Sequence, residues 1–302
     1  MTHDQLTTSF LKSVLKDRET ALALFQTHMY PEVSPLIDWN TFVIAGPIWK
    51  WKDEERKSIY QEVTYRALLK KNKGYIYLNA RHQRKIDPLM FIHVEKHNID
   101  IYQEYTNEIV KHTKQKNPKW PLVVNLVLYY GTKEDHTYHE DRFDYYPNPE
   151  LARSVMTIPY IAIDLSAAPG EGQFSYVTST GTEKQYPYLE DIYDYYENPE
   201  LARSVMSKSY ILVSLHKVSD EHLLSHGPCG LMEVLLKRAN SANFVDWLEA
   251  NRSLLRSYPL VPYLDEGLAY ALKVSNEDSS KIRKAFESIY PESTDAIIRT
   301  VK

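Results

Sequence analysis

The chain has 302 residues, of which 43% are hydrophobic and 25% are charged, and its formal net charge is −4. This composition is typical of a globular protein with one large domain, or of a domain with a helical appendage. A slightly acidic chain is not suited to coating a polyanion, so any nucleic-acid contact has to come from local basic clusters. The single cysteine, Cys229, excludes an internal disulfide and predicts a reducing, cytoplasmic compartment.

Several kinds of segment are missing from the sequence. No apolar run approaches the roughly 18 residues of a membrane span, so no membrane contact is expected. The N-terminus lacks a basic region followed by an apolar run, which argues against a secretory signal. No CxxC or CxxH spacing occurs, so a structural zinc is not expected.

The first half of the chain alternates between helical and strand patterns. Apolar residues at helical spacing over Leu6–His28 predict one amphipathic helix, with Thr7, Thr8 and Ser9 as candidate caps. A short strand is expected around Thr41–Ile44.

The stretch from Trp51 to Pro88 contains the predicted centre of the fold. Strand-like residues within Ser58–Leu69 and Tyr75–Leu78 flank the polar turn Lys70–Gly74, which is the pattern of a hairpin. A long helix is expected to follow over residues 87–112, with Asp87 as its cap and Pro88 at its first position. The apolar run at residues 121–130 predicts a central strand buried on both faces. This order of elements predicts an α/β or α+β layer arrangement in which helices flank a mixed sheet, and we favour the α/β class.

An internal repeat occupies the middle of the chain. Residues 138–156 recur at residues 188–206, and both copies contain Asn-Pro-Glu-Leu-Ala-Arg-Ser-Val-Met. Each copy predicts a turn, a short helix capped by Asn148 or Asn198, and then a strand. We interpret this as one tandem duplication, with copies at about 131–180 and 181–230. The second copy leads directly into the next helix, so we favour it as the source of the last core strand.

The remaining residues show short amphipathic helical segments separated by polar breaks. We therefore predict an α/β domain over residues 1–219 and a helical C-terminal subdomain over residues 220–302.

Two motifs in the hairpin carry a resemblance to a known family. Tyr-Gln-Glu-Val-Thr-Tyr at residues 60–65 resembles the family pattern Tyr-x-Asp-Leu-Leu-Tyr. Residues 78–90, which read Leu-Asn-Ala-Arg-His-Gln-Arg-Lys-Ile-Asp-Pro-Leu-Met, resemble Leu-Leu-Glu-His-Gln-Ser-x-x-Asp-Pro-Leu-Met. With His3-Asp4 and the Asn-Pro-Glu-Leu-Ala-Arg stretches, these motifs resemble the Rpn family of recombination-promoting nucleases or putative transposases, also called YhgA-like. The C-terminal helices resemble the family only loosely.

The resemblance implies a PD-(D/E)XK nuclease fold and metal-dependent cleavage of DNA, with Mg²⁺ as the cofactor. The family's metal-binding Asp falls on Glu62, which is therefore the predicted metal ligand. The family's Glu falls on Arg81, which offers no acceptor and repels a divalent cation. Gln83 is retained and is expected to orient the water or the phosphate. We predict that Glu62, Arg81 and Gln83 form the catalytic set, share a cleft, and make an impaired active site.

Basic residues next to this set predict where DNA is contacted. Arg81, Arg84 and Lys85 lie at the exit of the second hairpin strand, and each phosphate that they neutralise would add salt-dependent affinity. The simpler interpretation of such a charge run is a solvated turn, and the resemblance alone favours DNA.

Three hypotheses for function therefore remain open. The first is a DNA-acting protein of the nuclease family with a weakened site. The second is a catalytically inactive relative that binds DNA or a protein partner. The third is a degenerating gene product, which a recent duplication and lost site residues would also produce.

Overall fold

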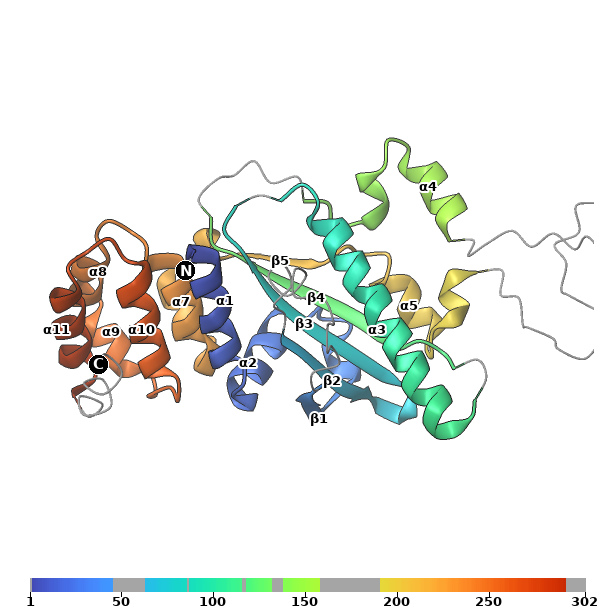
Figure 1. Cartoon of the computed structure of the whole chain (residues 1–302), viewed down its shortest axis with the longest axis horizontal. Coiled ribbons are helices and arrows are strands. Elements are labelled where there is room, and N and C mark those ends of the chain that lie inside the picture. Colours follow the sequence, from blue (N-terminus) through green and yellow to red (C-terminus); the bar gives the residue numbers. More distant parts are fainter. Residues whose placement is uncertain are drawn as a thin grey trace, which may run out of the picture.

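A five-stranded mixed sheet, in the order β1-β2-β3-β4-β5, lies at the centre of the protein (Figure 1). The computed structural model describes residues 2–45, 63–85, 87–115, 118–131, 138–157 and 191–291. The strands are β1 (Ile37–Ile44), β2 (Val63–Leu69), β3 (Tyr75–Gln83), β4 (Leu122–Tyr129) and β5 (Ile211–Ser214). β1, β2 and β3 are antiparallel neighbours, whereas β4 and β5 are added in parallel beyond β3. The predicted fold class, a nuclease-like mixed sheet flanked by helices, is confirmed.

The hairpin between β2 and β3 closes as its sequence predicts. A short 3₁₀ turn at Lys70–Asn72 leads to Gly74, whose φ is +96°. A side chain at Gly74 would also collide with the carboxylate of Glu197, because an added Cβ would lie 1.9 Å from a carboxylate oxygen. Glycine is thus required here by both the backbone conformation and the close approach of the second repeat copy.

Helices cover both faces of the sheet. The long helix α3 (Met90–Thr113) crosses one face, while α1 (His3–Val14) and α2 (Arg18–His28) cover the other (Figure 1). Successive residues of β3 point to opposite faces: Arg81 contacts the His93 carbonyl of α3, and His82 contacts Thr8 of α1. β4 is buried at all eight positions, as expected for a central strand with parallel neighbours on both sides.

The prediction of one continuous N-terminal helix is wrong. The chain breaks between α1 and α2, and Asp17 begins α2 by accepting a hydrogen bond from the Thr20 backbone N–H at 2.8 Å. The apolar spacing gave no sign of this corner because Leu15, which lies in it, is itself 1% exposed. The predicted caps are also wrong: Thr2 and Gln5 form the capping box of α1.

Both repeat copies fold into the same local structure. Each forms a 3₁₀ turn and then a helix, η4 (Arg142–Tyr145) with α4 (Pro149–Met156) and η5 (Ile192–Tyr195) with α5 (Pro199–Val205). Asn148 and Asn198 cap these helices by accepting the backbone N–H three residues later, at 3.0 and 3.2 Å. The second copy then supplies β5, as we favoured. The matching strand segment of the first copy, residues 160–165, lies outside the described residues.

The two copies differ in what their helices bury. Val205 and Met206 of the second copy are each 4% exposed, whereas the matching Val155 and Met156 are 55% and 40% exposed. Figure 1 shows α4 at the outer margin of the molecule and α5 against the sheet region. The residue before the shared Asn explains part of this difference, because Glu197 in the second copy accepts hydrogen bonds from the Tyr75 backbone N–H and the Tyr105 hydroxyl, both at 2.7 Å. The first copy has Pro147 at that position and cannot make these bonds.

The C-terminal helices pack on α1 and α2 rather than directly on the sheet (Figure 1). They are α6 (Asp220–Leu224), α7 (Gly230–Arg238), α8 (Phe244–Ala250), α9 (Arg252–Ser257), α10 (Leu264–Val274) and α11 (Ser279–Ile289). Phe10 of α1 stacks on Tyr270 of α10 with ring centroids 4.4 Å apart. The domain boundary between residues 219 and 220 stays a prediction. Within the described ranges, none of the helices combines the length and apolar character that crossing a bilayer demands.

The duplicated helices give a matched pair of core substitutions. We expect Met206→Ala to lower the free energy of unfolding by about 2–4 kcal/mol, because it leaves a cavity in the core. The same change at the exposed duplicate, Met156→Ala, should stay within about 0.5 kcal/mol of the parent. Denaturant unfolding of both variants measures this difference, and equal losses would contradict the assignment of the second copy to the core. A cooperative unfolding transition of the parent would also argue against the degenerating gene product.

Candidate active site

β3 is the middle strand of the five-stranded sheet, and its last residues are polar. Arg81 pairs with Val127 of β4 and Gln83 pairs with Tyr129. The backbone continues this pairing beyond the strand, since the Tyr130 N–H donates to the Gln83 carbonyl at 3.0 Å. The side chains that follow the apolar part of β3 are therefore held by strands on a rigid sheet.

The structure brings together two of the three predicted catalytic residues. Arg81 and Gln83 are two residues apart on β3 and therefore share the face that α3 covers. They are 7% and 5% exposed, and Nη2 of Arg81 donates to the His93 carbonyl at 3.4 Å. Glu62 lies outside the described residues, since β2 begins at Val63. A cleft shared by all three residues stays a prediction.

Buried polar atoms without a partner gather on this part of β3. Among the described residues, neither amide atom of Gln83 has a hydrogen-bond partner, and Oδ1 of Asn79 and Nδ1 of His82 lack one as well. Leaving such an atom unpaired costs about 1–3 kcal/mol, so groups of them are uncommon in a purely structural strand. This cost favours a functional role for the end of β3.

A chain of buried amides links this site to α3 and to the first repeat copy. Asn79 donates to Asn125 of β4 at 3.0 Å, and Asn125 donates to Asn98 of α3 at 2.9 Å. Asn98 in turn donates to Glu95 at 3.4 Å, and Glu95 pairs with Arg142 at 2.8 Å. Burial raises the pKa of Glu95, while Arg142 opposes that rise. Sequence analysis missed this network, although an asparagine within the apolar run of β4 was a signal for it.

The opposite face of β3 carries a second polar group, built with the N-terminal helix. The Thr8 hydroxyl donates to the Asp4 carbonyl at 2.8 Å, so we assign Nε2 of His82 as the donor to Thr8, also at 2.8 Å. Burial lowers the pKa of His82 to about 4; the charge of Asp4 raises it by a smaller amount, and His3 lowers it slightly further. His82 is therefore neutral at neutral pH.

Two tyrosines extend this second group towards the C-terminal helices. The hydroxyls of Tyr130 and Tyr270 both lie 3.2 Å from the hydroxyl of the buried Thr7. The His3 ring stacks on Tyr130 with centroids 6.2 Å apart. His3-Asp4 contributed to the family resemblance, but the sequence did not predict that the helix containing this motif would contact His82.

The predicted DNA-contacting residues differ in their surroundings. Lys85 is exposed, whereas Arg84 is partly buried. With the Asn240 amide in the orientation that its neighbours require, its oxygen accepts from Nη2 of Arg84 at 2.9 Å. Arg84 thus connects β3 to the C-terminal helices, and Lys85 is the more accessible of the two.

The described residues at the end of β3 do not fit a divalent metal. Arg81 supplies a guanidinium where a ligand oxygen is needed. Asp87, the nearest described carboxylate in sequence, already accepts from the Leu89 N–H at 2.9 Å and pairs with His93 at 3.1 Å. Three further acidic residues upstream of the hairpin, Asp53, Glu54 and Glu55, lie outside the described residues.

The mixed sheet and the polar end of its third strand define a nuclease-like α/β protein. The chain belongs to the family of putative transposases described as YhgA-like, whose sequence pattern matches residues 2–175 and 176–262. The junction of the two matches falls between the duplicated motifs, as a tandem duplication predicts.

Curated relatives support this assignment at modest identity. The chain is 27% identical over 160 residues to the recombination-promoting nuclease RpnC of Escherichia coli K12, covering 53% of this chain and 50% of that protein. It is 21% identical over 169 residues to RpnD of Escherichia coli O157:H7, covering 56% and 60%. It is also 21% identical over 160 residues to the inactive recombination-promoting nuclease-like protein RpnE of strain K12, covering 53% and 50%. The chain thus spans about half the length of these relatives. No solved structure matches significantly.

The lowered pKa of His82 predicts a pH dependence of stability. An unfolded histidine has a pKa of about 6.5, so between pH 6.5 and 4 the unfolded chain binds the extra proton. The contribution of neutral His82 to stability is therefore complete above about pH 6.5. The free energy of unfolding falls by up to about 3 kcal/mol as the pH drops towards 4. Denaturant unfolding at pH 7.5 and 4.5 measures this drop. In His82→Gln, the free energy of unfolding should fall less between the two pH values than it does in the parent. The exposed His112→Gln serves as the control, and a pH dependence unchanged in His82→Gln would show that His82 is solvated.

Proposed function

We propose that this chain is a DNA-acting protein of the recombination-promoting nuclease type whose metal-dependent endonuclease activity is impaired. The observation that carries the proposal is Arg81, a nearly buried guanidinium at the position where the family pattern has a carboxylate. Family membership supports DNA as the substrate, and this one residue supports the loss of efficient cleavage.

The chemistry at this position explains the impairment. Cleavage of a phosphodiester in this fold uses a divalent metal, expected to be Mg²⁺, to activate water and to neutralise developing charge. Glu62 remains the proposed metal ligand, and Gln83 the proposed group that orients water or phosphate. A fixed positive charge at Arg81 opposes the metal and suits an anion instead, because a guanidinium forms paired hydrogen bonds with phosphate oxygens.

A second candidate is a catalytically inactive module that binds DNA or a protein. Two observations favour it: the low exposure of both Arg81 and Gln83, and the existence of a relative that is itself named inactive. Under either proposal, the buried free thiol of Cys229 fits a cytoplasmic location.

Restoring the carboxylate tests the first candidate. We expect Arg81→Glu to raise Mg²⁺-dependent nicking of supercoiled plasmid at least about tenfold over the parent, because it replaces a repelled position with a ligand. Arg84→Glu makes the same charge change three residues away and should not restore nicking. Adding Gln83→Ala to Arg81→Glu should abolish the gain.

The outcomes separate the two candidates. Gain of cutting in Arg81→Glu alone supports a disabled nuclease site. Efficient cutting by the parent would contradict the impairment, and absence of cutting in a folded Arg81→Glu variant would favour the inactive module.

A salt titration tests DNA binding itself. We expect the parent to bind duplex DNA with an affinity that falls as salt rises, since phosphate contacts release counterions. Lys85→Glu should weaken binding and reduce the slope of log affinity against log salt by about 1. Lys284→Glu, at an exposed position of α11, should have little effect. Binding that is absent, or unaffected by Lys85→Glu, would refute the proposed DNA surface.

A further inference from the structure

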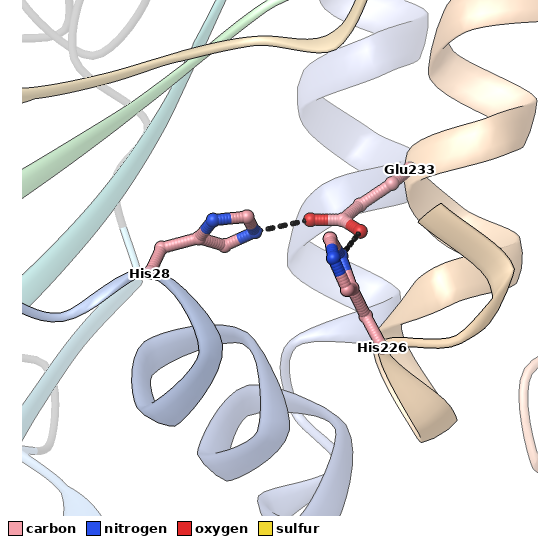
Figure 2. Close-up of side chains that lie close together, drawn as sticks. All are labelled: His28, His226 and Glu233. Atoms are coloured by element: carbon pink, nitrogen blue, oxygen red, sulfur yellow. Dashed lines mark hydrogen bonds and ion pairs between the residues drawn. The ribbon is translucent and has the colours of Figure 1, made fainter. Parts of the chain in front are cut away.

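Three side chains from distant parts of the sequence converge between α2 and α7 (Figure 2). His28 is the last residue of α2, His226 follows α6, and Glu233 lies in α7. Nε2 of His28 lies 2.6 Å from Oε1 of Glu233, and Nδ1 of His226 lies 2.6 Å from Oε2. One nitrogen from each ring and a carboxylate oxygen all lie within 4.8 Å of one another.

This group is withdrawn from water. The side chain of Glu233 is 0% exposed, and those of His28 and His226 are 12% and 9% exposed. Both oxygens of the Glu233 carboxylate are engaged by these rings, one by Nε2 of His28 and the other by Nδ1 of His226. A carboxyl group withdrawn from water in this way needs polar or cationic partners, and an ion held by all three side chains would be such a partner.

The donor atoms suit a particular class of cation. Two imidazole nitrogens and one carboxylate oxygen are the ligands of Zn²⁺ and related transition metals, whereas Mg²⁺ prefers oxygen ligands. Bonds of about 2.0–2.1 Å in a tetrahedral site place neighbouring ligand atoms about 3.3 Å apart. The two N–O separations of 2.6 Å would have to open by less than 1 Å, a change that small side-chain rotations supply.

The backbone around the group is held in place independently of it. Gly227, directly after His226, has a φ of +70° and turns the chain towards α7. The Tyr263 hydroxyl donates to the Pro228 carbonyl at 2.5 Å and accepts from the Met232 N–H at 3.1 Å, which fixes the start of α7. His226 and Glu233 therefore extend from a preformed frame.

The neighbouring cysteine is not a further ligand. The Cys229 side chain is buried, and its S–H is engaged by the backbone beside it. Its sulfur donates to the His226 carbonyl at 3.4 Å. A nitrogen–oxygen site is thus favoured over a thiolate site.

We propose that His28, His226 and Glu233 bind one divalent transition-metal ion of the Zn²⁺ class, which fastens α2 to α7. This site does not depend on the proposed nuclease function and is separate from the predicted Mg²⁺ site. It differs from the expectation, drawn from the sequence, that a structural zinc is absent. Its ligands are up to 205 positions apart, so no local spacing motif could have indicated them.

The test uses untagged full-length protein, stripped of metal by a chelator and dialysed. Competition with a chromogenic chelator should show one Zn²⁺ bound per chain, and Zn²⁺ should raise the melting temperature while Mg²⁺ does not. Glu233→Gln and His28→Ala should each weaken Zn²⁺ binding more than about tenfold. His112→Ala removes an exposed imidazole on α3 and should bind like the parent.

One outcome of this experiment would contradict the proposed metal site. If the parent binds no more Zn²⁺ than Glu233→Gln does, the three residues form an ion-pair cluster only. Circular dichroism establishes that each variant is folded. If Glu233→Gln does not fold, the comparison with His28→Ala decides, because His28 is partly exposed and lies at a helix end.

Discussion

The parallel pairing of β3 with β4 is the interaction on which the other features depend. It sets Asn79 opposite Asn125 in the interior, where α3 contributes Asn98 to complete a chain of amide hydrogen bonds. Buried amides tolerate little misplacement, because a shift of one residue leaves several of them unpaired. The register of the two strands and the position of α3 are therefore fixed together, and with them the location of Arg81 and Gln83.

Under the proposed function, this arrangement explains how the end of β3 keeps its place in the fold while the residue at position 81 differs from the family pattern. The scaffold that positions the end of β3 consists of strand pairing, the amide chain and the packing of α3, and none of these requires a carboxylate at residue 81. In this structure, Nη2 of Arg81 donates to the His93 carbonyl of α3. On that proposal, activity and stability depend on different residues at the same place, so a substitution at residue 81 can change cutting without disrupting the sheet.

The duplication shows that the surroundings of a short helix determine whether its apolar face is buried. α4 and α5 share a sequence and a capping asparagine, yet the apolar face of α4 is exposed and that of α5 is buried. Glu197 accepts hydrogen bonds from a backbone N–H at the start of β3 and from a tyrosine hydroxyl on α3. Pro147 has no side-chain acceptor and makes neither bond. Local sequence therefore determined the helix, and one neighbouring residue contributed to determining which copy entered the core.

The sequence by itself determined the order of elements, the mixed sheet, the buried β4 run, the glycine turn and the family, because these depend on local periodicity, turn chemistry and short motifs. It did not reveal the corner between α1 and α2, since the buried Leu15 continued the helical spacing through it. Only the tertiary structure brought His82 to the N-terminal helix, Asn79 to Asn98, and His28 to Glu233. Each of these contacts joins residues that are far apart in the chain, and their proximity follows from packing rather than from any pattern in sequence.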